Sequence, residues 1–428
     1  MFQNHPLDLH PNNFRSLLMF VLALANYSLM YAANILLARS LTVDDFDDYS
    51  VALSIVTMLS TLATLGLEKY ALRAVALFRD RQDWPKFRGF WLFSLRTISG
   101  FSLILVALLN FVLEAILAIH HSDYHIAIVI YACFLPIKAM TLFLVEVMAA
   151  HGAQILSMAI YRLFLPLVYV LLIIALSFSS LPLTAVTAVL CFGLAWVLTF
   201  IVIWFVTKML MPVEVKKSIP LRHEKKWLSR SLPLVFSSLM LTVMTSSGVV
   251  ILELLFPSGI EVGTYAIAAQ TGGFISLIGT STNRYYLPMM VVMIDRRDKQ
   301  AIQRLMNQRN WVLGGLIMML LAILAFSGHK ILALFGDQFS TGYNTVLIIA
   351  AGASVSALFA DIPYYLQFMG FHRAVLTLTM LATLSMVALG FLLGAEYGTI
   401  GMALAYMIPV VLLFIGLRIM AMLRFRRF

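Results

Sequence analysis

Four basic side chains lie inside long apolar runs of the sequence, where a charge is expensive to hold. They are Arg96, Lys138, Arg162 and Arg284. Lys138 is the most informative, because it falls at the centre of its run, where a cation in lipid costs about 3 kcal/mol or more. Three of the four lie in the amino-terminal half with a single interior acid, Glu146. This balance favours a cavity that binds phosphate. The alternative is a set of internal salt bridges, such as Glu146 with Arg162.

Hydroxyl side chains follow one face of the run 49–67 at helical spacing. The face comprises Ser50, Ser54, Thr57, Thr61 and Thr64. Steps of four, three, four and three residues keep them on one side of a helix. Glu68 continues this face, and Arg284 takes the equivalent position in the run 262–288, whose polar face begins at Gln270. We expect both runs to line a central path that Glu68 and Arg284 close on the cytoplasmic side. Alternatively, the hydroxyls only pack helices together and both charges reach the interface.

The first apolar run adds amides and rings on a shared face. Asn26, Tyr31 and Asn34 belong to it, together with Tyr27. Such groups suit a sugar, which has an apolar face and hydrogen-bonding edges, but hydrogen bonds between helices explain them equally well. Glu146 and Asp361 are the acids that fall inside apolar runs, and they are candidates for gating or ion coupling.

An acidic cluster precedes the second apolar run. It contains Asp44, Asp45, Asp47 and Asp48. Hard cations prefer carboxylates, so the cluster raises the alternative of a metal-dependent membrane glycosyltransferase that uses a polyprenyl phosphate. The loop is too short for an acceptor platform, and acids at a solvated helix N-terminus explain the cluster better. We therefore expect a protein that is not an enzyme and needs no metal or cofactor.

The composition around these residues is that of a membrane protein. The chain has 428 residues, 61% hydrophobic and 12% charged, with a mean hydropathy of +0.93. A soluble protein would be about a quarter charged. A cytosolic enzyme, a nucleic-acid-binding domain and a secreted disulfide scaffold are therefore excluded. The two cysteines, Cys133 and Cys191, both lie in apolar runs.

Twelve apolar runs are long enough to cross a bilayer, which needs about 20 residues per helix. They span roughly 15–39, 49–67, 89–113, 124–150, 153–178, 183–207, 231–255, 262–288, 310–328, 343–368, 374–394 and 399–420. The strands of a barrel would be shorter and would alternate in polarity. The sequence therefore predicts an all-α polytopic membrane protein with twelve transmembrane helices.

The charges give these helices an orientation. If the odd-numbered loops are external, only Arg39 and Lys330 of the 30 Lys and Arg residues lie outside, and four more lie within helices. Because Lys and Arg resist translocation, both termini are expected in the cytoplasm. The net charge of +10 then reflects topology, and no nucleic-acid partner is needed to explain it. Basic loops of this kind also suit the anionic head groups of membrane lipids.

The chain divides into two similar halves at its longest basic linker. A shift of 216 residues brings the segment 43–49 over 259–265, and 79–83 over 295–299. We expect a six-helix bundle at 1–208, a cytoplasmic linker at 209–230 and a second six-helix bundle at 231–428. Each bundle would begin and end in the cytoplasm, so a pseudo-two-fold axis would run along the membrane normal. A substrate path would then lie between the halves.

Short motifs along the whole chain resemble the polysaccharide (O-antigen type) flippases of the multidrug/oligosaccharidyl-lipid/polysaccharide exporter superfamily. The motifs are Leu37-Ala38-Arg39-Ser40-Leu41, Asp44-Asp45-Phe46-Asp47-Asp48-Tyr49-Ser50, Leu65-Gly66-Leu67 with Arg73, Leu366-Gln367-Phe368-Met369-Gly370 and Tyr397-Gly398-Thr399-Ile400-Gly401-Met402-Ala403-Leu404-Ala405. Asp48 departs from the glycine of many relatives. Gln270 stands nearest to where the resembling lipid II flippases carry an arginine, which favours a different lipid-linked glycan.

The resemblance implies a V-shaped bundle in the bacterial inner membrane that exports a polyprenyl-diphosphate-linked oligosaccharide, such as an O-antigen unit of lipopolysaccharide. Its expected partners are this lipid-linked oligosaccharide, membrane lipids and other membrane proteins of polysaccharide assembly. No nucleotide-binding Gly-x-x-x-x-Gly-Lys-Ser/Thr run occurs, so the energy would come from an ion gradient, the membrane potential or substrate removal. The main alternative is a cation-coupled multidrug exporter of the same superfamily, which would typically use acids inside its helices.

Overall fold

A computed structural model describes residues 10–120, 126–257, 259–295 and 299–427 of the chain. These residues form helices and connecting turns, with no strand among them. The first part contains α1 (His10–Ser40), α2 (Val43–Ala63), α3 (Leu67–Asp80), α4 (Trp84–His120), α5 (Ile126–Ala132), α6 (Leu135–Met148), η1 (Ala149–Ala153), α7 (Gln154–Ala159), η2 (Ile160–Phe164), α8 (Leu165–Ser177), α9 (Ala185–Leu210) and α10 (Val213–Lys217). The second contains α11 (Glu224–Leu255), α12 (Glu261–Asp295), α13 (Lys299–Ala333), η3 (Asp337–Gly342), α14 (Tyr343–Leu358), α15 (Ile362–Phe368) and α16 (His372–Arg427).

Glycines in the left-handed region break three of the long apolar stretches. Gly66 (φ 70°) follows α2, which is bent by 41° from α3. Gly152 (φ 87°) interrupts η1, between α6 and α7. The chain reverses at Gly398 (φ 56°), inside α16. The reversal brings Gly401 so close to Leu393 that a Cβ on Gly401 would overlap the Leu393 carbonyl. Glycine adopts such backbone angles without the steric penalty of a Cβ.

The fold is the all-α membrane architecture that the composition predicts. Within the described residues, eight helices are long and apolar enough to cross a membrane, or nine if α2 and α3 form one bent span. Two of the eight stretches, 135–177 and 372–423, contain the breaks at Gly152 and Gly398. A bilayer core is crossed by about 20 residues, so each of these stretches is long enough for two spans. The number of twelve spans stays a prediction.

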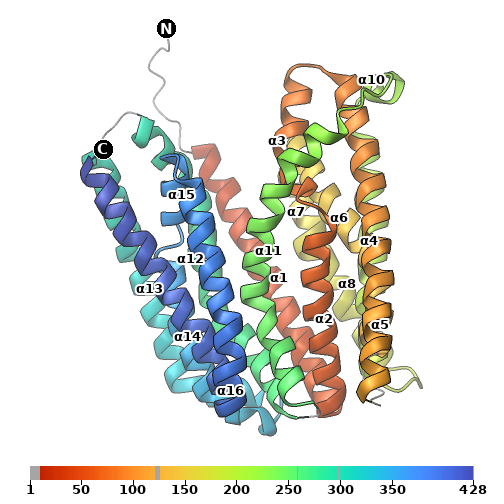
Figure 1. Cartoon of the computed structure of the whole chain (residues 1–428), viewed down its shortest axis with the longest axis vertical. Coiled ribbons are helices and arrows are strands. Elements are labelled where there is room, and N and C mark those ends of the chain that lie inside the picture. Colours follow the sequence, from red (N-terminus) through yellow and green to blue (C-terminus); the bar gives the residue numbers. More distant parts are fainter. Residues whose placement is uncertain (1–9, 121–125, 258, 296–298, 428) are drawn as a thin grey trace.

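The helices form two groups that meet at one end and diverge at the other (Figure 1). We call residues 10–217 the first group and residues 261–427 the second group. Helix α11 runs between them: near its start Trp227 packs against Phe90 of α4, with ring centroids 5.5 Å apart. Near its end, Gly248 lies against the ring of Tyr265 of α12. Consequently α11 is attached to both groups.

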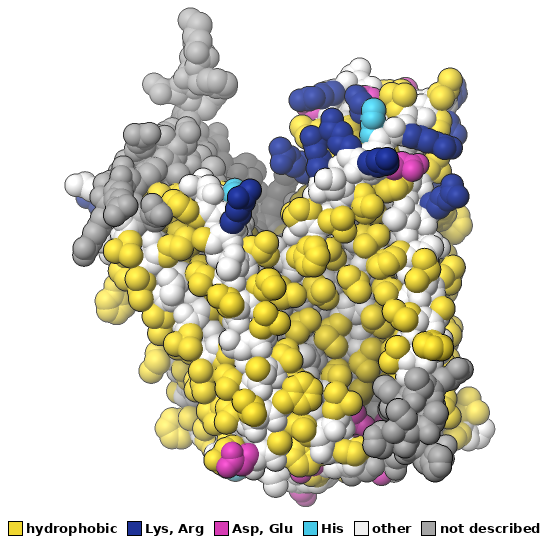
Figure 2. Space-filling view, viewed as in Figure 1, with side chains coloured by type: hydrophobic (Ala, Val, Ile, Leu, Met, Phe, Trp, Pro, Cys, Tyr) yellow, Lys and Arg dark blue, Asp and Glu magenta, His cyan; other side chains and the backbone are white. Residues whose placement is uncertain are grey.

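Lys and Arg side chains gather at the end where the groups diverge, and Asp and Glu side chains appear at the opposite end (Figure 2). We call these the basic end and the acidic end. The surface is hollowed between the two groups at the basic end (Figure 2). On this face, Lys and Arg side chains are therefore concentrated at one end of the helices, which agrees with the expectation that most of them lie on one side of the membrane.

A buried ion pair holds α13 against the break between α14 and α15. The Arg309 guanidinium donates from Nη1 to Asp361 Oδ1 at 2.8 Å and to the Leu358 carbonyl at 2.9 Å. Both charged side chains are essentially inaccessible to solvent. Leu358 ends α14, where carbonyl oxygens lack partners within their own helix. Arg309 therefore neutralises the charge of Asp361 and also donates a hydrogen bond to a carbonyl at the end of α14.

We predict that Asp361→Asn destabilises the protein by about 3–5 kcal/mol, because it leaves the Arg309 charge buried without a counter-charge. The double variant Arg309→Met/Asp361→Leu should recover most of that loss, since apolar groups of similar volume replace the pair. Denaturant unfolding in detergent measures both effects. The control is Lys69→Met, which removes the partly exposed Lys69–Glu146 pair (3.7 Å) and should cost less than about 1 kcal/mol. Equal losses for Asp361→Asn and Lys69→Met would contradict the prediction.

Candidate functional site

Polar side chains of α1 bind α12 across the boundary between the two groups. The Tyr27 hydroxyl donates to the Gln270 carbonyl. Tyr31 and Thr271 share a hydrogen bond of 3.0 Å, and Asn34 Nδ2 donates to Gln270 Oε1 at 2.7 Å. The α1 residues follow one another at steps of four and three, so they share one face of the helix. We call Tyr27, Tyr31, Asn34, Gln270 and Thr271 the inter-group network.

The network continues into the core of the first group. Asn34 Oδ1 accepts a hydrogen bond of 3.3 Å from the Tyr49 hydroxyl, which in turn accepts one of 2.9 Å from Tyr169. Tyr49 and Tyr169 are both fully buried. Hydrogen bonds in sequence fix the orientation of each member, so the buried tyrosines present Asn34 to Gln270.

Closer to the acidic end, aromatic rings and backbone groups complete the contact. Tyr31 packs edge-on against Phe335, with ring centroids 5.0 Å apart, and Phe46 packs against Phe339 at 5.8 Å. Arg39 donates from Nε to the Leu334 carbonyl at 2.6 Å. All three contacts join residues 31–46 to residues 334–339. The two groups are therefore sealed together at the acidic end.

Asp47 reaches the start of α12 across the same boundary. Its side chain is buried, and its Oδ1 lies so close to Gly263 that a Cβ there would come within 2.4 Å of it. Gly263 is in the first turn of α12, which begins at Glu261. A carboxylate is stabilised beside the positive end of a helix dipole. The first group thus supplies an acid to the N-terminus of a helix in the second.

Toward the basic end the predicted lining residues lie on α1, α2 and α12. Thr61 shares a hydrogen bond of 3.2 Å with Thr242 of α11, and Ser54, Thr57 and Asn26 are half-buried. On α12, one turn beyond Gln270, a Cβ on Gly273 would meet no atom within 4 Å. The hydroxyl face of α2 therefore makes an inter-helix contact at Thr61, as the packing alternative expects, while α12 leaves open space at Gly273.

Lys138 is enclosed within the first group. Its side chain is 6% exposed, and its Nζ donates to Thr57 Oγ1 at 3.0 Å. The ammonium also lies 5.6 Å from the ring centroids of Tyr131 and Trp196, where aromatic faces attract a cation. No described carboxylate forms a salt bridge with it. Lys138 is thus held by a hydroxyl that belongs to the predicted lining of α2.

The other predicted cations occupy different environments. Arg96 is exposed on α4, and Arg162 is half-buried in η2. Arg284 belongs to α12, but its side chain lies outside the described part of the structure. The predicted Glu68–Arg284 gate therefore has one described member, Glu68, which is buried at the start of α3. The roles of these residues stay predictions.

Of the three acids predicted to gate or couple ions, Glu146 and Asp361 form salt bridges. Glu146 pairs with Lys69 at 3.7 Å, and Asp361 pairs with Arg309 at 2.8 Å. Sequence reasoning missed Arg309, because it sits one residue before the apolar run 310–328 and counted as a cytoplasmic charge. A signal was present, since Asp361 lies deep inside the apolar run 343–368, and an acid inside a membrane needs a partner.

The acidic cluster supports helix ends. Asp45 Oδ1 accepts a hydrogen bond of 2.8 Å from the backbone nitrogen of Ala185, the first residue of α9. Its Oδ2 accepts one from Thr42 Oγ1, and Thr42 caps α2. Among the described residues, no group of three His, Cys, Asp or Glu side chains is arranged to hold a metal ion. Asp45 thus does what acids near helix N-termini are expected to do.

Comparison with solved structures identifies this architecture. A multidrug resistance MATE family transporter of the MOP superfamily in an inward-facing conformation has a TM-score of 0.74 and 14% identity, covering 96% of this chain and 99% of that one. Lipid II flippase MurJ in an inward closed conformation has a TM-score of 0.71 and 14% identity, with coverage of 95% and 87%. An outward-facing MATE family transporter of the MOP superfamily has a TM-score of 0.62 at 14% identity, covering 96% of each chain.

The two-group fold expected from the resemblance is confirmed by these structures, all of which are too distant in sequence to show more than a fold. A search of the curated proteins found no match. A family model described as "Polysaccharide biosynthesis protein" matches residues 15–293, which include nearly all of the first group, α11 and most of α12. The chain therefore belongs to the polysaccharide biosynthesis protein family, and its fold is that of MATE family transporters and of lipid II flippase MurJ.

Proposed function

We propose that this protein flips a polyprenyl-diphosphate-linked oligosaccharide, such as an O-antigen or other surface polysaccharide unit, across the bacterial inner membrane by alternating access. The observation that carries the proposal is the asymmetry of the boundary between the groups. It is sealed at the acidic end by the inter-group network and hollowed at the basic end (Figure 2). This is the geometry of a transporter that is open on one side.

The basic end faces the cytoplasm in this proposal, because Lys and Arg are retained on that side during insertion. Lipid-linked oligosaccharides would then enter the hollow from the leaflet next to the enzymes that assemble them. The sugars and diphosphate would cross between the groups, while the lipid tail stays in the bilayer. Export would require the inter-group network to open and the basic end to close.

The interior charges support an anionic substrate. Glu146 and Asp361 are already occupied by Lys69 and Arg309, so neither is a free carboxylate awaiting a coupling cation. Lys138 pairs with no described carboxylate and donates to Thr57 on the predicted lining face. A lysine provides a point charge for phosphate. We propose that Lys138, with Arg96, Arg162 and Arg284, supplies the positive potential that the diphosphate meets.

Orientation is tested by labelling single cysteines in a Cys133→Ser background, because Cys133 is exposed and Cys191 is buried. Glu396→Cys probes the acidic end and Lys225→Cys the basic end, and both native residues are exposed. A membrane-impermeant maleimide should label position 396 in intact spheroplasts and position 225 only after lysis. The reverse pattern would overturn the orientation.

Deletion of the gene should abolish the surface polysaccharide and cause its lipid-linked precursor to accumulate on the cytoplasmic leaflet. Mass spectrometry of the lipid extract and gel analysis of surface glycans measure the two effects, and plasmid-borne expression should reverse both. Drug susceptibility should not change. An unchanged glycan profile combined with raised drug susceptibility would favour the multidrug exporter instead.

Loss of the inter-group network should open the acidic end. In the Cys133→Ser background, spin labels at Asp44→Cys and Gln338→Cys report the distance between the groups, since both positions are exposed there. The variant Tyr27→Phe/Tyr31→Phe/Asn34→Leu removes the three hydrogen bonds of the network that cross the boundary. At about 0.6 kcal/mol each, their loss should make the more distant population grow roughly twentyfold.

The matched control is Thr345→Val, which removes a hydrogen bond of 3.0 Å to Thr399 within the second group. It should leave the distance distribution unchanged. If the triple variant also leaves it unchanged, the network does not hold the acidic end closed.

A further inference from the structure

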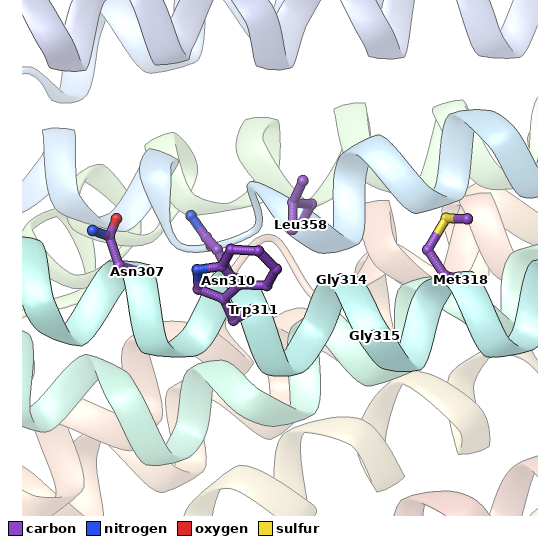
Figure 3. Close-up of a pocket in the computed structure, with 7 residues that line it drawn as sticks. All are labelled: Asn307, Asn310, Trp311, Gly314, Gly315, Met318 and Leu358. Atoms are coloured by element: carbon purple, nitrogen blue, oxygen red, sulfur yellow. The ribbon is translucent and has the colours of Figure 1, made fainter.

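A pocket of about 520 Å³ opens on α13 (Figure 3). Its lining consists of Asn307, Asn310, Trp311, Gly314, Gly315, Met318 and Leu358. The volume lies within the roughly 300–1,000 Å³ of small-molecule sites. Six of the seven residues come from α13, which packs against α12, α14 and η3 of its own group. The pocket is therefore separate from the proposed substrate path.

The floor of the pocket is fixed by the buried ion pair. Arg309 Nη1 donates to the Leu358 carbonyl at 2.9 Å and approaches Asn310 Oδ1 at 3.4 Å, while it binds Asp361 at 2.8 Å. Leu358 and Asn310 both line the pocket. Because the ion pair holds α14 in place beside α13, the pocket is a built feature of the second group.

Two adjacent glycines open the pocket to the surroundings. A Cβ on Gly314 or Gly315 would meet no atom within 4 Å. Trp311 precedes them with 83% of its surface exposed, and Met318 follows with 66%. These residues belong to the apolar stretch 300–333, which is long enough to cross a membrane. An indole, a thioether and a gap between them provide a surface for a hydrocarbon chain.

The same face of α13 carries polar groups toward the basic end. Arg304 is exposed, and Asn307, Trp311, Gly314 and Met318 follow it at steps of three, four, three and four residues, which places all five on one side of the helix. From the basic end inward the face therefore presents a guanidinium, an amide, an indole, a gap and a thioether. Arginine binds phosphate, and tryptophan favours the membrane interface.

We propose that this face binds one anionic phospholipid of the cytoplasmic leaflet, with its phosphate at Arg304 and Asn307 and an acyl chain in the gap at Gly314 and Gly315. The order of polar and apolar groups along α13 matches the order of groups in such a lipid. The charge of Arg304 selects an anionic head group. The site binds a resident lipid and takes no part in moving the oligosaccharide.

Native mass spectrometry of the purified full-length protein tests the proposal. The protein is released from detergent containing phosphatidylglycerol, phosphatidylcholine or polyprenyl phosphate, and the retained lipid is counted. Phosphatidylglycerol should be retained preferentially. Gly315→Leu fills the gap and should reduce its retention at least tenfold. Arg304→Gln should reduce it about fivefold, as expected for the loss of one cation near a phosphate.

Two matched controls separate the pocket from general lipid contact. Gly100→Leu makes the same change at another exposed glycine with open space around its Cβ, and Lys225→Gln removes another exposed cation at the basic end. Neither should alter retention by more than twofold. A thermal unfolding midpoint within a few degrees of the parent shows that each variant is folded.

Three results would overturn the proposal. Equal retention of phosphatidylglycerol and phosphatidylcholine would remove the head-group selectivity. Equal effects of Gly315→Leu and Gly100→Leu would remove the pocket. Displacement of phosphatidylglycerol by an equal concentration of polyprenyl phosphate would make the occupant the carrier lipid. None of these outcomes bears on whether the protein exports a glycan, since no transport is measured.

Discussion

A polar group inside a membrane must find its partner within the protein, because the hydrocarbon offers none. This constraint explains the partners of three polar side chains that lie in the apolar stretches. Arg309 serves both Asp361 and the end of α14, and Lys138 relies on Thr57 and two aromatic faces. Asn34 is satisfied on both sides, by Tyr49 and by Gln270. The contact with Gln270 differs from the others because it joins the two groups. The hydrogen bonding of Asn34 therefore depends on how the two groups are placed relative to each other.

The fold class could be predicted from the sequence because it depends on the hydropathy and charge of many residues taken together. Runs of apolar side chains and the distribution of Lys and Arg are robust to errors at single positions. Two of the breaks were predicted as well, because the apolar runs end at 150 and 394 and resume at 153 and 399, on either side of Gly152 and Gly398. The bend at Gly66 was missed, since it falls inside the predicted run 49–67. A left-handed backbone angle is set by the packing of the flanking helices.

The site was predicted in its residue types more than in their partners. Tyr31, Asn34 and Gln270 were singled out as lining, and the structure shows them bonded to the opposite group. A sequence reports that an amide lies on a helix face, but the face opposite depends on how helices tilt and rotate. The same reason made Arg162 a plausible partner for Glu146, whereas the observed partner is Lys69 on α3. Charge count alone does not select among neighbouring helices.

The tight reversal at Gly398 has a consequence for biosynthesis. The two arms of α16 are joined with almost no connecting loop, since Gly401 sits against Leu393. In the proposed orientation, this hairpin tip must be carried across the bilayer when the nascent chain is inserted. Glu396 is the one charged residue between positions 374 and 417. Insertion of the last two spans therefore moves a single carboxylate and no cation, and acids hinder translocation far less than Lys or Arg.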